Sequence, residues 1–287
     1  MRGARRAVHF RVTIRCAVVG HPIRHSLSPA IHQAAYAKLG LPWTFDAVDL
    51  PDGGLPNFVA GLDASWRGLA VTMPHKADAA KVGSPDRLVQ RLGVANTVVF
   101  DADDVHVYNT DVSGFVHALA YRRLDDVDDV VMLGAGATAR AAVMALANIG
   151  VTKVTAQVRD PARAGVWQQL ADDLGLDAAV RPLGDATGGE LLLSTLPSQA
   201  ANPWAEHLVA KCQAVFDVSY DPWPTKLISA AQSAALPIVT GLDLLAGQAI
   251  QQIDLLAGDT LDMAALLRAG EQGRAAAADG DGGAAMA

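Results

Sequence analysis

Two charged side chains in this sequence stand where they could transfer a proton. Lys76 follows a proline-fixed turn after the β-prone run Gly68–Met73, and Asp111 lies just before a predicted domain junction. A carboxylate beside an ammonium orients it, and the ammonium can then donate a proton to an oxygen that gains negative charge. Taken alone, each residue is more often a surface charge. A catalytic role for the pair is supported by its co-occurrence with a serine-rich loop and a glycine-rich turn.

A hydroxyl-rich segment, His25–Pro29, carries Ser26 and Ser28 two positions apart. Serine, histidine and proline at this density are typical of a loop rather than a strand interior. Two hydroxyls in a proline-bounded loop are suited to bind a small polar ligand. The sequence therefore predicts a small-molecule site here.

A glycine-rich segment, Gly134-x-Gly136-x-x-Ala139, follows an apolar strand-like run and opens an alanine-rich helix. In that context Gly134 permits a tight turn, Gly136 lets the backbone approach a pyrophosphate, and Ala139 allows close helix–strand packing. The free N–H groups at the helix start, around Ala137 and Thr138, favour a phosphate. The segment predicts a dinucleotide site, and the alternative is a glycine turn without a ligand.

The segment after the next predicted strand bears on the choice of cofactor. Arg159 and Arg163 lie four positions apart and could converge on the 2′-phosphate of NADP. Asp160 between them would repel that phosphate unless its side chain turns away, and it could instead favour the 2′-hydroxyl of NAD. The alternative is a solvated charged loop.

The predicted elements form two α/β units. The first has strands at 14–19, 45–50 and 68–73, helices at 30–39 and 57–62, and a hairpin of 95–100 with 105–108. From about Ser113, strands at 130–133, 153–158, 191–195, 215–218 and 237–240 alternate with helical or irregular stretches, starting with a helix at 137–149. This alternation predicts a doubly wound parallel sheet of the Rossmann type. Two ligand sites in two α/β domains predict a cleft between them, as in a dehydrogenase. The last predicted helix, 244–256, is compatible with either unit.

Composition excludes several other classes. The net charge of −7 argues against a nucleic-acid-binding surface, and no apolar run approaches the roughly 18 residues of a membrane span. Cys16 and Cys212 lack metal-ligand spacing. The basic residues 1–13 and the low-complexity residues 273–287 predict disordered ends. We expect a cytoplasmic protein without nucleic-acid or membrane partners, and the sequence leaves monomer and homodimer open.

Seven segments, in this order and spacing, resemble the shikimate dehydrogenase family from about Cys16 to about Gly270. They are Gly20–Pro29 (GHPIRHSLSP), Val71–Lys76 (VTMPHK), Gly93–Thr97 (GVANT), Tyr108–Asp111 (YNTD), Gly134–Ala139 (GAGATA), Asp217–Tyr220 (DVSY) and Gly241–Gln248 (GLDLLAGQ). Bare similarity to a Rossmann domain would not produce this whole set.

The resemblance implies a role for each candidate residue. Lys76 and Asp111 would be the catalytic pair. The hydroxyls of Ser26, Ser28 and Tyr220 would bind the carboxylate of shikimate or 3-dehydroshikimate. The ring hydroxyls would be bound by Thr72, Asn96 and Gln248. The cofactor NADP(H) would be bound by Gly134, Gly136, Ala137, Thr138, Ala139, Arg159, Arg163, Ser194, Thr195 and Gly241. No metal is expected, because the lysine ammonium can stabilise a developing alkoxide.

The resemblance also implies the activity and the domains. Residues 14–112 with 241–272 would form the substrate-binding catalytic domain, and 113–240 the NADP-binding Rossmann domain. The reaction would be the reversible NADPH-dependent reduction of 3-dehydroshikimate to shikimate in the chorismate pathway. Two alternatives stay open: an NAD-dependent quinate/shikimate dehydrogenase, and a non-enzymatic sensor of the metabolite. The presence of both Lys76 and Asp111 argues against the sensor.

The sequence departs from the family pattern at a few positions. Ala70 stands where many members carry asparagine, which removes one polar contact near Thr72. Val158 and Asp160 flank Arg159 where the family usually has asparagine and a hydroxyl residue, and Val112 replaces a common glycine. We expect the first departure to loosen the hold on substrate and the second to weaken the preference for NADP.

Overall fold

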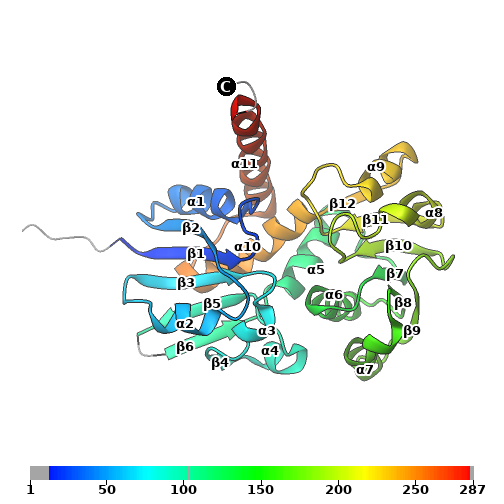
Figure 1. Cartoon of the computed structure of the whole chain (residues 1–287), viewed down its shortest axis with the longest axis horizontal. Helices are drawn as coiled ribbons and strands as arrows, with labels where there is room; N and C mark the ends of the chain where they lie inside the picture. The colour runs from blue at the N-terminus through cyan, green and yellow to red at the C-terminus, as the bar shows by residue number, and fades with distance from the viewer. Residues whose placement is uncertain (1–12, 103, 285–287) are drawn as a thin grey trace, which may run out of the picture.

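The computed structural model describes residues 13–102 and 104–284, and within them the strands form two separate six-stranded sheets (Figure 1). One sheet contains the strands of residues 15–108 and the other those of residues 129–240. The chain returns afterwards through two long helices to the first sheet. The predicted α/β class with two units is confirmed.

The first sheet is mixed, with the strand order β2-β1-β3-β5-β6-β4. Its strands are β1 (Arg15–Gly20), β2 (Thr44–Asp49), β3 (Trp66–Val71), β4 (Ser84–Pro85), β5 (Thr97–Asp101) and β6 (Asp104–Tyr108). β1 runs parallel to both β2 and β3, whereas β5 is antiparallel to β3 and β6. The predicted hairpin of β5 and β6 is confirmed. β1 and β3 point their carboxyl ends at the same edge, so Gly20 and Val71 both lead into loops there.

The second sheet is entirely parallel, with the order β12-β11-β10-β7-β8-β9. Its strands are β7 (Asp129–Leu133), β8 (Lys153–Val158), β9 (Asp177–Pro182), β10 (Gly189–Ser194), β11 (Cys212–Asp217) and β12 (Ile238–Thr240). Numbered from β7, this is the 3-2-1-4-5-6 order of a dinucleotide-binding Rossmann sheet. The strand order reverses between β7 and β10, and ligands bind outside the carboxyl ends of strands at such a point. β9 was not predicted, since its residues alternate weakly and none is fully buried.

Helices cover both sheets and join them. They are α1 (Ser28–Lys38), α2 (Leu55–Ala60), α3 (Lys76–Ala79), α4 (Arg87–Leu92), α5 (Asp111–Arg122), α6 (Ala137–Asn148), α7 (Gly165–Asp173), α8 (Ala205–Val209), α9 (Lys226–Ser233), α10 (Gly241–Ala257) and α11 (Met263–Ala284). Two 3₁₀ turns, η1 (Pro161–Arg163) and η2 (Asn202–Trp204), complete the set. α5 and α10 lie between the sheets (Figure 1).

The helices α5 and α10, which lie between the two sheets, cross each other at close range. A Cβ atom on Gly247 would lie 2.5 Å from the Gly114 carbonyl oxygen, so only glycine permits this approach. The capping box of Thr240 and Asp243 sets where α10 begins. Farther along, Ile253 of α10 packs into the core of the first sheet. The last predicted helix, left open by composition, therefore packs on the first unit.

The prediction of a disordered tail from residue 273 was wrong over most of its length, because α11 continues to Ala284. Alanine is the best helix former, and four alanines follow Arg274. The helix also docks: a Cβ on Gly273 would lie 2.5 Å from Ala30 of α1, and the Arg274 guanidinium lies 4.7 Å from the Trp223 ring. The low-complexity composition of this segment predicts disorder, but the segment forms a helix that packs against α1 and Trp223.

Apart from Thr13, the predicted basic extension 1–13 lies outside the described residues, as does 285–287. Among the helices that the structure describes, none is both long and apolar enough to span a bilayer.

Candidate active site

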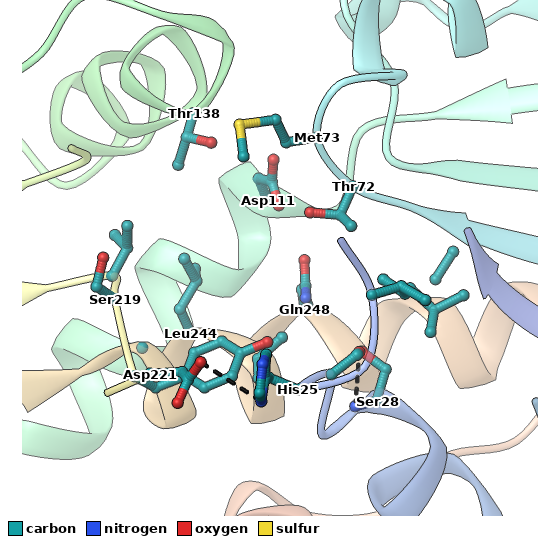
Figure 2. Close-up of a pocket in the computed structure, with 18 of the residues that line it drawn as sticks. His25, Ser28, Thr72, Met73, Asp111, Thr138, Ser219, Asp221, Leu244 and Gln248 are labelled. Carbon is teal, nitrogen blue, oxygen red and sulfur yellow. Dashed lines mark hydrogen bonds and ion pairs between the residues drawn. The ribbon is translucent and has the colours of Figure 1, made fainter. Parts of the chain in front are cut away.

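A cleft of about 490 Å³ lies at the carboxyl ends of strands from both sheets (Figure 2). The loops after β1, β3, β10 and β11 form its walls, together with the first turns of α5, α6 and α10. Ten of the predicted site residues line it: Ser26, Ser28, Thr72, Lys76, Asp111, Thr138, Thr195, Tyr220, Gly241 and Gln248. Six of the seven segments singled out in the sequence thus contribute to one cavity, and Gly93–Thr97 does not line it.

The predicted catalytic pair is formed. Lys76 Nζ lies 2.5 Å from Asp111 Oδ2, although the two residues come from the starts of α3 and α5. The Lys76 side chain is 14 % exposed and that of Asp111 only 3 %. Such shielding from water strengthens the pair and keeps the ammonium in one orientation. The ammonium is therefore held at the wall of the cleft with donor capacity to spare.

Asn96 lies behind this pair and does not line the cleft. Its amide nitrogen donates to Asp111 Oδ1 at 2.9 Å and to Gln248 Oε1 at 3.0 Å. Its carbonyl oxygen accepts from the backbone N–H of Thr110 at 2.7 Å and from the hydroxyl of Thr97. Both amide hydrogens are used, so in this structure Asn96 holds Asp111 and Gln248 rather than offering a group to a ligand.

Thr72 and Gln248 both line the cleft near this pair. The N–H of Thr72 continues the β1 ladder by donating to the Val19 carbonyl at 2.9 Å, which fixes the loop after β3. Gln248 follows the Gly247 crossing, so the approach of α10 to α5 sets its position. Figure 2 shows both side chains facing the open space beside Asp111. Their hydroxyl and amide can hydrogen-bond a polyhydroxylated ligand.

The serine loop places its two hydroxyls at the start of α1. Ser28 is the first residue of the helix and is buried, and its N–H donates to Ser26 Oγ at 3.3 Å. The N-cap residue Leu27 makes no side-chain cap, so at this end of α1 Ser26 Oγ engages the Ser28 N–H, Pro29 has no N–H, and the Ala30 N–H is left without a described partner. Burial and the neighbouring Asp221 carboxylate raise the pKa of Tyr220 to about 12, so its phenol stays a neutral donor. Hydroxyls and a helix N-terminus together suit a carboxylate.

The glycine turn has the backbone of a dinucleotide cradle. Gly134 has φ +103°, and a Cβ there would lie 2.6 Å from Thr195 Oγ1, so only glycine fits. A Cβ on Gly136 would meet no described atom within 4 Å, which leaves open space over the turn. α6 begins at Ala137 without a side-chain cap from the described residues, and buried Ala139 packs in the core. Thr138 on the first turn faces the cleft (Figure 2).

The arginine loop lies at the end of β8, next to the glycine turn, because β7 and β8 are neighbours. Arg159 and Arg163 are exposed. Asp160 caps η1, its carboxylate accepting from the Ala162 N–H at 3.1 Å. The repulsive carboxylate is thus engaged with its own turn. Neither arginine lines the cleft itself.

Residues at the ends of β10 and β11 support the cleft floor. Thr195 lines the cavity and donates through Oγ1 to the Leu133 carbonyl at 2.8 Å, which joins β10 to β7. Ser194 is buried and does not reach the cavity. Burial raises the pKa of Asp217 to about 6, and its carboxylate accepts from Thr225 Oγ1 at 2.7 Å and from the Ser219 N–H at 3.2 Å. Asp217 thereby anchors the loop that carries Tyr220.

Some residues of the site were not predicted from sequence. Met73 lines the cleft and is 60 % exposed, lying between Thr138 and Thr72 in Figure 2. An exposed methionine inside a cavity is unusual, since apolar side chains favour burial. Arg140 of α6 has a buried Nε atom without a partner among the described residues, and burial lowers its pKa. Arg140 could have been found from the sequence, because it is a cationic residue in the first turn of the helix that follows the glycine turn.

Known proteins have sequences similar to that of this chain. Residues 18–98 match the family described as the shikimate dehydrogenase substrate binding domain. The chain is 35 % identical over 244 residues to the NADP(+) shikimate dehydrogenase of Moorella thermoacetica, a match covering 80 % of this chain and 83 % of that protein.

Solved structures of related dehydrogenases have a similar fold. The shikimate dehydrogenase of Mycobacterium tuberculosis superimposes with a TM-score of 0.83 at 33 % identity, covering 90 % of this chain and 99 % of that one. The quinate dehydrogenase of Corynebacterium glutamicum, in complex with NAD, gives a TM-score of 0.78 at 25 % identity, covering 90 % and 98 %. The predicted resemblance is confirmed, and this chain belongs to the shikimate dehydrogenase family.

Proposed function

We propose that the protein is a shikimate dehydrogenase that reduces 3-dehydroshikimate to shikimate with NADPH, reversibly. The observation that carries this function is the Lys76–Asp111 pair at 2.5 Å, placed in a cleft between a carboxylate-binding loop and a Rossmann glycine turn. The names of the similar proteins supply the substrate and cofactor class. Binding both molecules in one cleft makes the reaction effectively intramolecular.

The Rossmann half fits NADPH, which supplies a hydride when bound. Open space over Gly136 and uncapped N–H groups at the start of α6 suit its pyrophosphate. Side chains on a helix tilt toward its N-terminus, so the Arg140 guanidinium would add positive charge near the start of α6, where the pyrophosphate would bind. Arg159 and Arg163 would hold the 2′-phosphate, and capping by Asp160 of its own turn favours NADP over NAD. Thr195, Gly241 and exposed Met73 would border the nicotinamide.

Substrate orientation comes from the first half. The carboxylate would accept hydrogen bonds from Ser26, Ser28 and Tyr220 at the start of α1, whose N–H groups favour negative charge. Thr72 and Gln248 would bind ring hydroxyls. For Asn96 we propose a positioning role through Asp111 and Gln248 instead of the direct contact that the resemblance implies, because both its amide hydrogens are already donated.

Proton transfer falls to Lys76. As a C–H bond forms at the ketone carbon, the electrons of the C=O double bond move to oxygen, and the ammonium donates a proton to that oxygen. Asp111 keeps the ammonium oriented before the transfer, and solvent returns the proton to the amine afterwards. The ammonium, held in place by the nearly buried Asp111, stabilises the negative charge that develops on that oxygen.

The test is oxidation of NADPH by 3-dehydroshikimate with purified protein, with parallel reactions using NADH and quinate. We expect shikimate to form in equal amount to the NADPH consumed, with much lower kcat/KM for quinate and for the NAD couple. Faster turnover of quinate with NAD would contradict the assignment in favour of the quinate/shikimate alternative. Shikimate binding without turnover under all conditions would instead support the sensor.

We also propose a cytoplasmic location. The support is that Cys16 and Cys212 are both buried free thiols, and disulfides are rare in reducing compartments. Light scattering on the purified protein will distinguish the monomer from the homodimer.

A further inference from the structure

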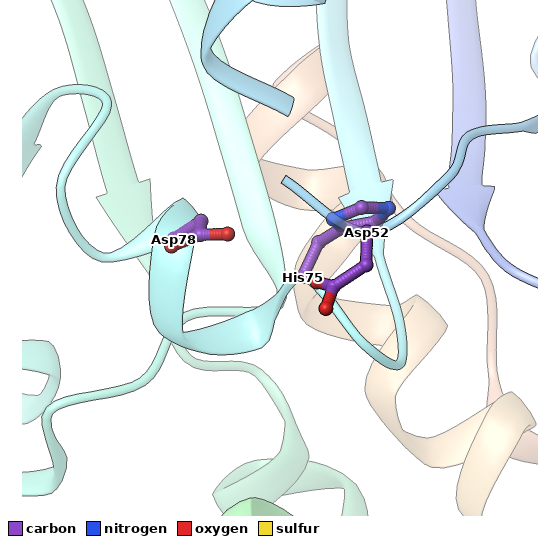
Figure 3. A group of neighbouring side chains, drawn as sticks. All are labelled: Asp52, His75 and Asp78. Carbon is purple, nitrogen blue, oxygen red and sulfur yellow. The ribbon is translucent and has the colours of Figure 1, made fainter. Parts of the chain in front are cut away.

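Three potential metal ligands gather outside the cleft: Asp52, His75 and Asp78 (Figure 3). One ligand atom from each lies within 4.8 Å of the other two. Asp52 comes from the loop between β2 and α2, whereas His75 and Asp78 belong to the first turn of α3. None of the three lines the cleft. The cluster therefore belongs to neither the substrate site nor the cofactor site.

His75 is prepared to act as a metal ligand. Its side chain is fully buried, and Nε2 lies 2.7 Å from the Leu50 carbonyl oxygen. Because a carbonyl can only accept, Nε2 donates this hydrogen bond, and Nδ1 is the ring nitrogen left for a ligand. Nδ1 is buried and has no hydrogen-bond partner among the described residues. A histidine that donates one ring N–H to a backbone carbonyl and keeps the other nitrogen free is the usual arrangement around a bound metal.

The two carboxylates complete the set of three ligands. Asp78 is half-buried, and its only described ion pair, with Lys81 at 3.8 Å, is long and leaves one oxygen free. Asp52 is exposed and makes no hydrogen bond or ion pair through its carboxylate within the described residues. Both groups can therefore turn toward an ion without breaking a strong contact.

We propose that Asp52, His75 and Asp78 bind a divalent transition-metal ion of the Zn²⁺, Mn²⁺ or Co²⁺ class. One imidazole nitrogen and two carboxylate oxygens suit these ions better than Mg²⁺ or Ca²⁺, which prefer oxygen ligands alone. Water fills the remaining positions. The sequence led us to expect no metal; the ligands were missed because Asp52 is distant in sequence from the other two.

The ion would tie the loop after β2 to the turn that carries Lys76, the residue directly after His75. It takes no part in the reaction, because its ligands do not reach the cleft. Its effect is on stability: a ligand that binds only the folded state raises the melting temperature with concentration.

The experiment starts from tag-free protein treated with a chelator and dialysed. Calorimetric titration with ZnCl₂, and absorption spectra on titration with CoCl₂, should show one site per chain, with a rise of several degrees in melting temperature at saturating Zn²⁺. Asp52→Asn and Asp78→Asn should each weaken binding at least tenfold. Both positions are at least partly exposed, so the variants should fold.

Asp46→Asn, which removes an exposed carboxylate from β2 of the same domain, is the matched control and should bind Zn²⁺ like the unmodified protein. The proposal is overturned if no Zn²⁺ or Co²⁺ binds, or if Asp52→Asn and Asp78→Asn bind as tightly as Asp46→Asn. Because none of these readouts is turnover, its failure is separate from any failure of the proposed dehydrogenase activity.

Discussion

The substrate side and the cofactor side of the cleft differ in how far they are organised before a ligand binds. On the substrate side, Lys76, Asp111, Asn96 and Gln248 are linked by hydrogen bonds of 2.5–3.0 Å. On the cofactor side, the start of α6 has no side-chain cap among the described residues, and Arg159 is exposed.

The difference has a physical consequence. A network that is already formed costs little entropy when the transition state is reached, so its residues should act mainly on kcat. Exposed side chains must lose rotamer freedom on binding, so the cofactor side should act mainly on affinity and on the choice of nucleotide. The four predictions below test this contrast, from the largest expected effect to the smallest.

Lys76→Ala should lower kcat by roughly 10²–10⁴-fold, the usual contribution of a general acid, and weaken shikimate binding far less. Steady-state rates and calorimetric titration with shikimate measure the two quantities. Asp111→Asn should behave similarly, whereas Lys81→Ala, an exposed lysine on the same segment, should change neither. A Lys76→Ala enzyme with near-normal kcat and only a higher KM would remove Lys76 from the chemistry.

Arg159→Ala should reduce the preference for NADPH over NADH by about 10–150-fold, which corresponds to a charge-assisted contact of about 1.5–3 kcal/mol. The measurement is the ratio of kcat/KM for the two cofactors. Arg163→Ala should have a smaller effect, because Arg163 lies farther from the end of β8. An unchanged ratio in Arg159→Ala would favour the NAD-using alternative.

Ser28→Ala should weaken shikimate binding by about tenfold, since a hydrogen bond to a charged group contributes about 1.5 kcal/mol or more. Ser26→Ala should act in the same direction. Calorimetry with shikimate provides the measurement, and Ser233→Ala, an exposed serine of α9, is the control. Unchanged affinity in a Ser26→Ala/Ser28→Ala double variant would exclude this loop from the site.

Gly136→Ala should raise the KM for NADPH by about fivefold, as expected for a steric cost of about 1 kcal/mol against the pyrophosphate. Its melting temperature should not fall, because φ is −83° and the new Cβ meets no described atom within 4 Å. Gly165→Ala, at the equally open start of α7, is the matched control and should leave KM unchanged. Equal KM values in both variants would place the pyrophosphate elsewhere.

Much of the fold was predictable because its signals are local. The apolar runs that became β7 and β8, and the glycine turn after β7, were read within one or two residues of their observed limits. Failures arose where local and tertiary signals disagree. The weakly alternating β9 needs its neighbour β8 to define it, and the alanine-rich end of α11 needs α1 and Trp223 to dock against.

The candidate site divides in the same way. The sequence by itself determined which residue types stand at the ends of which strands, and hence a serine loop, a glycine turn and a lysine beside a proline. Only the tertiary structure decided that both amide hydrogens of Asn96 are donated to Asp111 and Gln248. It also decided that Met73 is exposed in the cleft and that Asp52 lies close to His75. Strand ends follow from local patterns of burial and turn chemistry. Contacts between distant segments depend on how closely elements pack, as at the Gly114–Gly247 crossing, and no spacing along the chain encodes that distance.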